Sequence, residues 1–96
     1  KCDLACRHCG SRAGRPRDEE LSVAEALGVL DQLAAMGTEE ISFIGGEAYL
    51  SPWFLAVVRG ASDRGIRPVM TTGGRKVDAR LANAAAEAGL KAVSVS

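Results

Sequence analysis

The chain has 96 residues, which suits one domain at most, and its 47% hydrophobic and 25% charged residues are typical of a globular protein. Twelve basic residues balance twelve acidic ones, so no bulk charge favours nucleic acid as a partner. No apolar run approaches the length that spans a bilayer and no signal peptide is visible, so the sequence predicts no membrane partner.

All three cysteines of the chain, Cys2, Cys6 and Cys9, lie within eight residues in the spacing C-x3-C-x2-C. Thiolates this close in sequence can bind one metal centre without help from distant residues. A closed zinc site or a closed iron–sulfur cluster takes four ligands, so three cysteines leave one metal position open for chemistry. The pattern therefore predicts a cluster with one open iron, in a reducing compartment.

Three other interpretations of the cysteines stay open at this point. A disulfide between two of them would leave an odd thiol, and nothing suggests a small secreted scaffold. A structural zinc site could take His8 as its fourth ligand, but His8 is adjacent to Cys9, and neighbouring side chains rarely converge on one tetrahedral ion. Inert buried cysteines fit poorly beside the charged residues Lys1, Asp3 and Arg7.

A solvated loop and then a helix are predicted after the cysteines. Ser11–Glu20 contains three arginines, a glycine and a proline, with little apolar content. The helix is predicted over Ser22–Met36, because Ser22 and Glu25 form a capping-box pattern ahead of an apolar stripe. The residues of this stripe recur at helical spacing and are Val23, Ala26, Leu27, Leu30, Leu33 and Ala34.

Short strands alternate with two further helices in the rest of the chain. The predicted strands are Glu40–Ile44, Arg67–Thr71 and Ala92–Ser96. Pro52 suits the first turn of the second helix, which ends at Gly65, and Asp78 suits the cap of the third, which ends at Gly89. The side chains predicted to face solvent are Arg59, Ser62 and Asp63 on the second helix, and Arg80, Asn83 and Glu87 on the third.

This alternation predicts an α/β fold, with a parallel sheet built from right-handed βαβ units. Loops that follow parallel strands open on one face, which carries the site in such folds. Two glycine-rich turns, Gly45–Glu47 and Thr71–Gly74, fall on this face with Ser96, although a tight turn alone would also need glycine. The cysteine loop joins them if a strand precedes Lys1.

The C-x3-C-x2-C motif, with His8 in an aromatic-type position before the last cysteine, and Gly45–Glu47 after the next strand together resemble the radical S-adenosylmethionine (radical SAM) enzymes. The resemblance covers essentially the whole chain. It implies that residues 1–96 are the N-terminal half of a partial (β/α)6 TIM-like barrel, whose first strand and C-terminal half lie outside these residues. We expect these residues to be inactive alone.

The resemblance also implies the cofactors, a 4Fe–4S cluster held by the three cysteines and S-adenosylmethionine on its open iron. The reduced cluster of such enzymes cleaves S-adenosylmethionine to methionine and a 5′-deoxyadenosyl radical, which abstracts hydrogen from a substrate. The residues that match cofactor-binding positions are His8 along the adenine, Gly45, Gly46 and Glu47 at the methionine ammonium, Thr71, Thr72 and Gly73 in a Thr-Asn-Gly stretch, and Ser96 at the ribose or methionyl end.

Two positions depart from the pattern of these enzymes. Ala48 stands where a proline often follows Gly-Gly-Glu. Gly73 stands where the stretch has asparagine, so any side-chain contact there is lost.

The C-x-L-x-C-x-H-C form of the first loop resembles the subgroup with a C-terminal auxiliary-cluster (SPASM-type) domain. This implies a cytoplasmic oxidoreductase that modifies a peptide or protein, with a flavodoxin- or ferredoxin-type electron donor and no nucleic-acid or membrane partner. Two alternatives remain: a non-catalytic iron–sulfur or zinc binding module, and a radical SAM enzyme of cofactor or haem biosynthesis with a small-molecule substrate.

Overall fold

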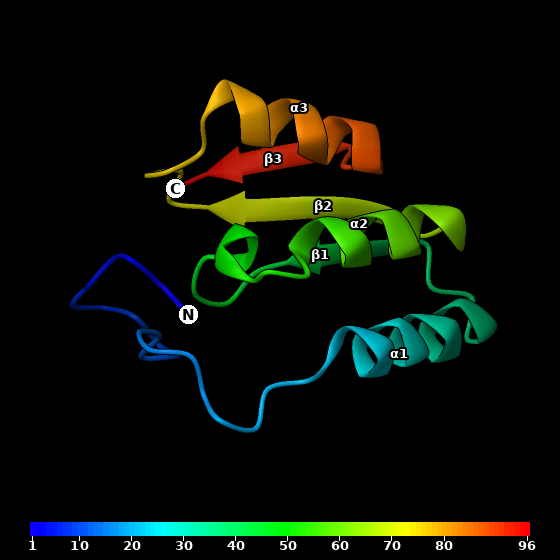
Figure 1. Ribbon diagram of the computed structural model, residues 1–96, viewed down its shortest axis with the longest axis horizontal. Coiled ribbons are helices and arrows are strands. Elements are labelled where there is room, and N and C mark those ends of the chain that lie inside the picture. The colour runs from blue at the N-terminus through cyan, green and yellow to red at the C-terminus, as the bar shows by residue number, and fades with distance from the viewer.

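Three parallel strands form one sheet in the computed structural model, which describes residues 1–96. The strands are β1 (Glu40–Phe43), β2 (Arg67–Thr72) and β3 (Ala92–Val95), in the order β1-β2-β3. Glu40 pairs with Arg67, and Val69 pairs with Ala92. All three arrowheads point toward the side of the molecule where both chain ends lie (Figure 1). The predicted α/β fold class, a parallel sheet with alternating helices belonging to part of a barrel, is confirmed.

Each strand is preceded by a helix, as the alternation predicts. The helices are α1 (Val23–Ala35), α2 (Phe54–Asp63) and α3 (Ala79–Ala88), and a short 3-10 helix η1 (Ala48–Leu50) follows β1. α2 packs against both α1 and α3, so the three helices form a continuous layer (Figure 1). No helix in the structure is long and apolar enough to cross a membrane.

The predicted helix caps are confirmed. The Ser22 hydroxyl accepts a hydrogen bond from the Glu25 N–H at 3.2 Å, and the Glu25 carboxylate accepts one from the Ser22 N–H at 3.0 Å. Asp78 accepts one from the Leu81 N–H at 2.8 Å. These bonds satisfy N–H groups that have no partner within a helix. Gly89 ends α3 with a φ of 111°, a left-handed conformation that glycine adopts without strain.

Two apolar clusters hold the helices to the sheet. One contains Phe54, Val58 and Met70, and the other contains Leu30 and Ile66. Phe43 of β1 packs against both clusters and meets Phe54 edge-on, with ring centroids 5.8 Å apart. The predicted apolar stripe of α1 supplies Ala26 and Leu30 to the second cluster, so helical periodicity identified the buried face of this helix.

Some predicted details are wrong. Pro52 does not lie in the first turn of α2, because η1 and a turn through Ser51 intervene and the helix begins at Phe54. Val23 was predicted in the apolar stripe, yet it is the first residue of α1 and is 39% exposed. Ser62 was predicted to face solvent, yet it is half-buried against Gly89, where an added Cβ would come within 2.5 Å of its hydroxyl.

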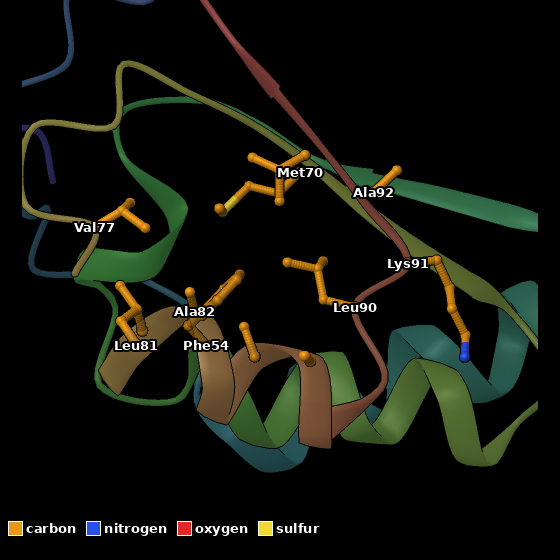
Figure 2. Close-up of a pocket in the computed structure, with 11 residues that line it drawn as sticks. Phe54, Met70, Val77, Leu81, Ala82, Leu90, Lys91 and Ala92 are labelled. Carbon is orange, nitrogen blue, oxygen red and sulfur yellow. The ribbon is translucent and has the colours of Figure 1, made fainter. Parts of the chain in front are cut away.

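A pocket of about 220 Å³ remains between α3 and the sheet. Figure 2 shows Met70 and Leu90 directed into this space, with Leu81 and Val77 at its end. Ten of its eleven lining residues are hydrophobic, and Lys91 is the exception. We therefore attribute this pocket to incomplete packing and not to a catalytic site.

Candidate functional site

The cysteines lie on the N-terminal strap, Lys1–Glu20, which contains no helix or strand. The Cys2 N–H donates to the Gly14 carbonyl at 2.8 Å and closes the strap on itself. The Glu47 N–H donates to the Lys1 carbonyl at 2.9 Å, which ties the strap to the turn after β1. A Cβ at Gly46 would collide with the Lys1 carbonyl group, so this close approach requires glycine. The strap therefore lies at the carboxyl ends of the strands, on the predicted face (Figure 1).

All three cysteines are free thiols, so the disulfide interpretation is not supported. Cys6 is exposed, and Cys2 and Cys9 are half-buried. The Cys9 N–H donates to the Cys6 carbonyl at 3.2 Å and forms a turn between these two cysteines. The Cys9 sulfur lies 3.4 Å from the Ser11 hydroxyl, and this hydrogen bond lowers the pKa of Cys9 below its ordinary value.

The thiols are not gathered into a metal-ligating arrangement, and no three His, Cys, Asp or Glu side chains in the chain are. The donor set nevertheless fits an iron–sulfur cluster, because three free thiols share one short loop and none is fixed in the apolar core. Cys2, Cys6 and Cys9 are therefore the residues that would hold such a group.

Glu47 is buried, with 5% of its surface exposed, and it bridges the two glycine-rich turns. The Thr72 hydroxyl donates to one oxygen of its carboxylate, and the Gly73 N–H donates to the other at 2.7 Å. The Gly74 N–H donates to the Thr72 hydroxyl at 3.0 Å and orients it. A carboxylate that accepts such bonds is well satisfied despite its burial, so Glu47 fixes the end of β1 against the end of β2.

The other predicted cofactor residues lie along the same edge. The Ser96 N–H donates to the Thr72 carbonyl at 3.0 Å, and Thr71 is half-buried within β2. An added Cβ at Gly73 would come within 2.5 Å of the Leu4 side chain and 3.0 Å of a Glu47 oxygen, so a side chain there would require the end of the Leu4 side chain to move. His8 is exposed, and no hydrogen bond ties its side chain to the chain. The structure thus brings Glu47, Thr72, Gly73 and Ser96 together, whereas the His8 side chain is exposed.

Four residues that the sequence did not indicate fix the loop after β2 against the strap and η1, and these are Asp3, Tyr49, Arg75 and Lys76. The Arg75 guanidinium donates to the Asp3 carbonyl at 2.8 Å, and the Lys76 ammonium lies 3.8 Å from the Asp3 carboxylate. The Lys76 N–H donates to the Tyr49 hydroxyl at 3.1 Å. Burial raises the pKa of Tyr49, the Lys76 hydrogen bond opposes this, and the negative charges of Asp3 and Glu47 add to it. Two adjacent basic residues directly after a glycine-rich turn were the available signal.

A hollow of about 720 Å³ opens beside the turn after β1, within the size range of about 300–1,000 Å³ usual for ligand pockets. It lies between residues Pro16–Leu21 of the chain and the segment from Phe43 to Phe54. Gly46 and Glu47 line it, whereas the three cysteines and Thr71–Gly73 do not. Only part of the predicted cofactor site therefore borders this hollow.

The fold and the position of the strap define a parallel α/β protein that carries a three-cysteine loop at the carboxyl ends of its strands. The model of the Radical SAM superfamily matches residues 1–96. The chain belongs to this superfamily of enzymes, which confirms the predicted family.

Relatives with different names match the same region. Fe-coproporphyrin III synthase of Methanosarcina barkeri is 35% identical over 97 residues, covering 100% of this chain and 24% of that protein. The sporulation killing factor maturation protein SkfB of Bacillus subtilis is 41% identical over 61 residues, covering 64% of this chain and 15% of that protein. The chain spans about a quarter of the length of the curated relatives that match all of it.

The crystal structure of BtrN in complex with AdoMet and 2-DOIA superposes with a TM-score of 0.83. It shares 23% sequence identity, and the superposition covers 99% of this chain and 41% of that one. At this identity the likeness shows the fold alone.

Proposed function

We propose that these residues are the part of a radical SAM enzyme that holds a 4Fe–4S cluster and S-adenosylmethionine. When bound, the two together supply a 5′-deoxyadenosyl radical that abstracts hydrogen from a substrate. Cys2, Cys6 and Cys9 would hold the cluster, and the open iron would take the cofactor. The family match over residues 1–96 supports this function.

One structural observation carries the proposal: the cysteine strap is hydrogen-bonded directly to the Gly-Gly-Glu turn. The bond from the Glu47 N–H to the Lys1 carbonyl and the contact of Gly46 with Lys1 bring the two motifs together, although about 40 residues separate them. The cysteine loop and the Gly-Gly-Glu turn, which the proposed chemistry requires close together, therefore lie next to each other.

The chain's own residues have distinct roles in this proposal. The buried Glu47 carboxylate, already held by Thr72 and Gly73, offers a fixed negative charge toward an ammonium group. His8, Thr71 and Ser96 would contact the adenine, ribose or methionyl parts, as the family resemblance implies.

Anaerobic reconstitution of the full-length protein followed by electron paramagnetic resonance tests the function. We expect the spectrum of the reduced cluster to change when S-adenosylmethionine is added. An unchanged spectrum would favour a passive iron–sulfur module, and zinc in place of iron in the purified protein would favour a zinc module. Either outcome would overturn the proposal.

We further propose a peptide or protein as substrate, within the auxiliary-cluster subgroup. The similarity to the maturation protein SkfB supports this, and so does the form of the first loop. A flavodoxin- or ferredoxin-type protein would supply the electron, in the cytoplasm, where three thiols stay reduced. Residues 1–96 would form part of the barrel, in keeping with the 41% of the BtrN chain that superposes.

A tetrapyrrole is the second candidate substrate. Fe-coproporphyrin III synthase matches the whole chain, whereas SkfB matches 64% of it. Titration of the full-length protein with iron coproporphyrin III, followed by absorption spectroscopy, separates the candidates. A saturable shift of the porphyrin band would favour the tetrapyrrole, and its absence the peptide.

A further inference from the structure

Asp3, between Cys2 and Leu4 on the strap, has an unusual environment. Its side chain is only 12% exposed, and both carboxylate oxygens are buried without a hydrogen-bond partner. A buried carboxylate without hydrogen bonds is costly unless a cation lies close to it. We therefore expect a positively charged group close to the Asp3 carboxylate.

The loop after β2 provides that charge. The Lys76 ammonium lies 3.8 Å from the Asp3 carboxylate, and the Arg75 guanidinium, 2.8 Å from the Asp3 carbonyl, is fixed on the backbone of the same residue. The Lys76 backbone is itself fixed by its bond to the buried Tyr49 hydroxyl. The cation is thus carried by a segment anchored in the apolar layer.

We propose that Lys76 is a positioning residue, which fixes the cysteine loop by pairing with the buried carboxylate of Asp3. The inference rests on the proposed function only in taking this loop as the one that binds the cluster. Lys76 does not touch a thiol in this arrangement; it acts through Asp3, the residue directly after Cys2. Its role is to hold Cys2 against the rim that carries Glu47 and Gly73.

The asymmetry of burial distinguishes this pair from an ordinary surface ion pair. Lys76 is 63% exposed and Asp3 is 12% exposed. Two exposed partners would contribute little. Here, removal of Lys76 leaves a buried carboxylate without its nearest cation, and movement of the strap into water would restore the solvation of that carboxylate.

Thiol alkylation of the full-length apo-protein, without cluster or S-adenosylmethionine, tests the proposal. Iodoacetamide labelling followed by peptide mass spectrometry gives the rate at each cysteine separately. We expect Lys76→Met to raise the alkylation rate at half-buried Cys2 about tenfold, because loss of a partly buried ion pair should raise the population of the open strap by roughly one decade. Loss of a nearby cation disfavours a thiolate and by itself slows alkylation, so an acceleration reports opening of the strap. Exposed Cys6 should change less than about twofold in this assay.

Three further variants, with Asp3→Asn alone as a reference, make the test decisive. Arg80→Met removes a positive charge from the exposed surface of α3 and should leave the Cys2 rate unchanged. Lys76→Arg keeps the positive charge and should also leave the Cys2 rate unchanged. Asp3→Asn combined with Lys76→Met should match Asp3→Asn alone, because a neutral residue at position 3 needs no cation.

A wild-type Cys2 rate in Lys76→Met would overturn the proposal, as would a Cys2 rate in the double variant that differs from the rate in Asp3→Asn alone. If Lys76→Met does not fold, as judged by circular dichroism, the double variant must regain both the fold and the Asp3→Asn rate; otherwise Lys76 acts elsewhere. Because the apo-protein is measured, a failed reconstitution would contradict the proposed function without affecting this result.

Discussion

The strap and the helix–sheet layer are stabilised by different kinds of contact. The layer, Val23–Val95, is held by two apolar clusters and a strand ladder. The strap, Lys1–Glu20, has no helix or strand, and hydrogen bonds and close contacts at the rim hold it in place. Its thiols supply the proposed chemistry, while the layer supplies the free energy of folding.

From this difference we expect the function and the stability of the protein to be separable by substitution. Binding residues are commonly carried on loops that a rigid scaffold positions. Substitutions in the layer should therefore change the free energy of unfolding, and substitutions on the strap should change binding. The predictions below test that separation.

Replacement of a cysteine should have the largest effect. Cys6→Ala should abolish the catalytic cluster of the full-length protein, because two thiolates cannot hold it in place. Iron and sulfide analysis after reconstitution, corrected for any auxiliary clusters, measures this. Since Cys6 is exposed, the free energy of unfolding of the apo-protein should change by less than about 0.5 kcal/mol. Exposed Arg7→Ala is the control, and wild-type cofactor cleavage by Cys6→Ala would contradict the assignment.

A core substitution should do the reverse. Leu30 of α1 is 1% exposed, so Leu30→Ala should lower the free energy of unfolding by about 2–5 kcal/mol through lost burial and a cavity. Denaturant unfolding of the full-length apo-protein measures this. Val29→Ala on the same helix, where Val29 is 43% exposed, should cost well under half as much. If Leu30→Ala folds yet binds no cluster under native conditions, the two regions are not separable.

Glu47 belongs to both regions, and two substitutions divide its roles. Glutamine at position 47 can still accept from the Gly73 N–H and can donate to the Thr72 hydroxyl, so Glu47→Gln should fold normally. It lacks the charge for an ammonium, so S-adenosylmethionine should bind more weakly by about 1–3 kcal/mol, or roughly tenfold to hundredfold.

Glu47→Ala, in contrast, leaves a buried hydroxyl and a half-buried N–H without their acceptor, which should lower the free energy of unfolding by about 1–3 kcal/mol as well. Calorimetric titration and denaturant unfolding measure the two effects. Equal cofactor affinity in Glu47→Gln and wild type would remove the carboxylate from the binding site.

The sequence predicted the layer better than the strap, for a physical reason. Helices and strands follow from local periodicity and caps, as with Ser22 and Asp78, and burial then selects one face. The bond of Glu47 to Thr72 joins residues 25 positions apart, and Arg75 reaches Asp3 across 72 positions. No local pattern encodes such contacts. Motif spacing identified the thiols and turns, but not which side chains fix them.

The smallest predicted effect concerns Ser22, at the junction of strap and layer. Ser22→Ala removes one half of the capping box and should lower the free energy of unfolding by about 1 kcal/mol. Cys2 alkylation should not change, because Ser22 belongs to the helix and not to the contacts of the strap.

The second hydrogen bond of the capping box, which the Ser22 N–H donates to the Glu25 carboxylate, depends on pH. The Ser22 N–H lowers the pKa of Glu25, and the Ser22 hydroxyl lowers it further, so in the wild type Glu25 is ionised in the folded state at a lower pH than in the unfolded chain. A lowered folded pKa stabilises the protein above the unfolded pKa, and that contribution is lost as the pH falls through the folded pKa. Ser22→Ala keeps the backbone N–H, so only the hydroxyl's part of this contribution is lost, and the stability difference between wild type and Ser22→Ala should be largest at neutral pH and shrink in part in acid, below the usual range of a glutamate carboxyl. Denaturant unfolding across that range measures it. A difference independent of pH would assign the effect to the hydrogen bond that the Ser22 hydroxyl accepts from the Glu25 N–H. Faster Cys2 alkylation in Ser22→Ala would show that the helix and the strap are coupled.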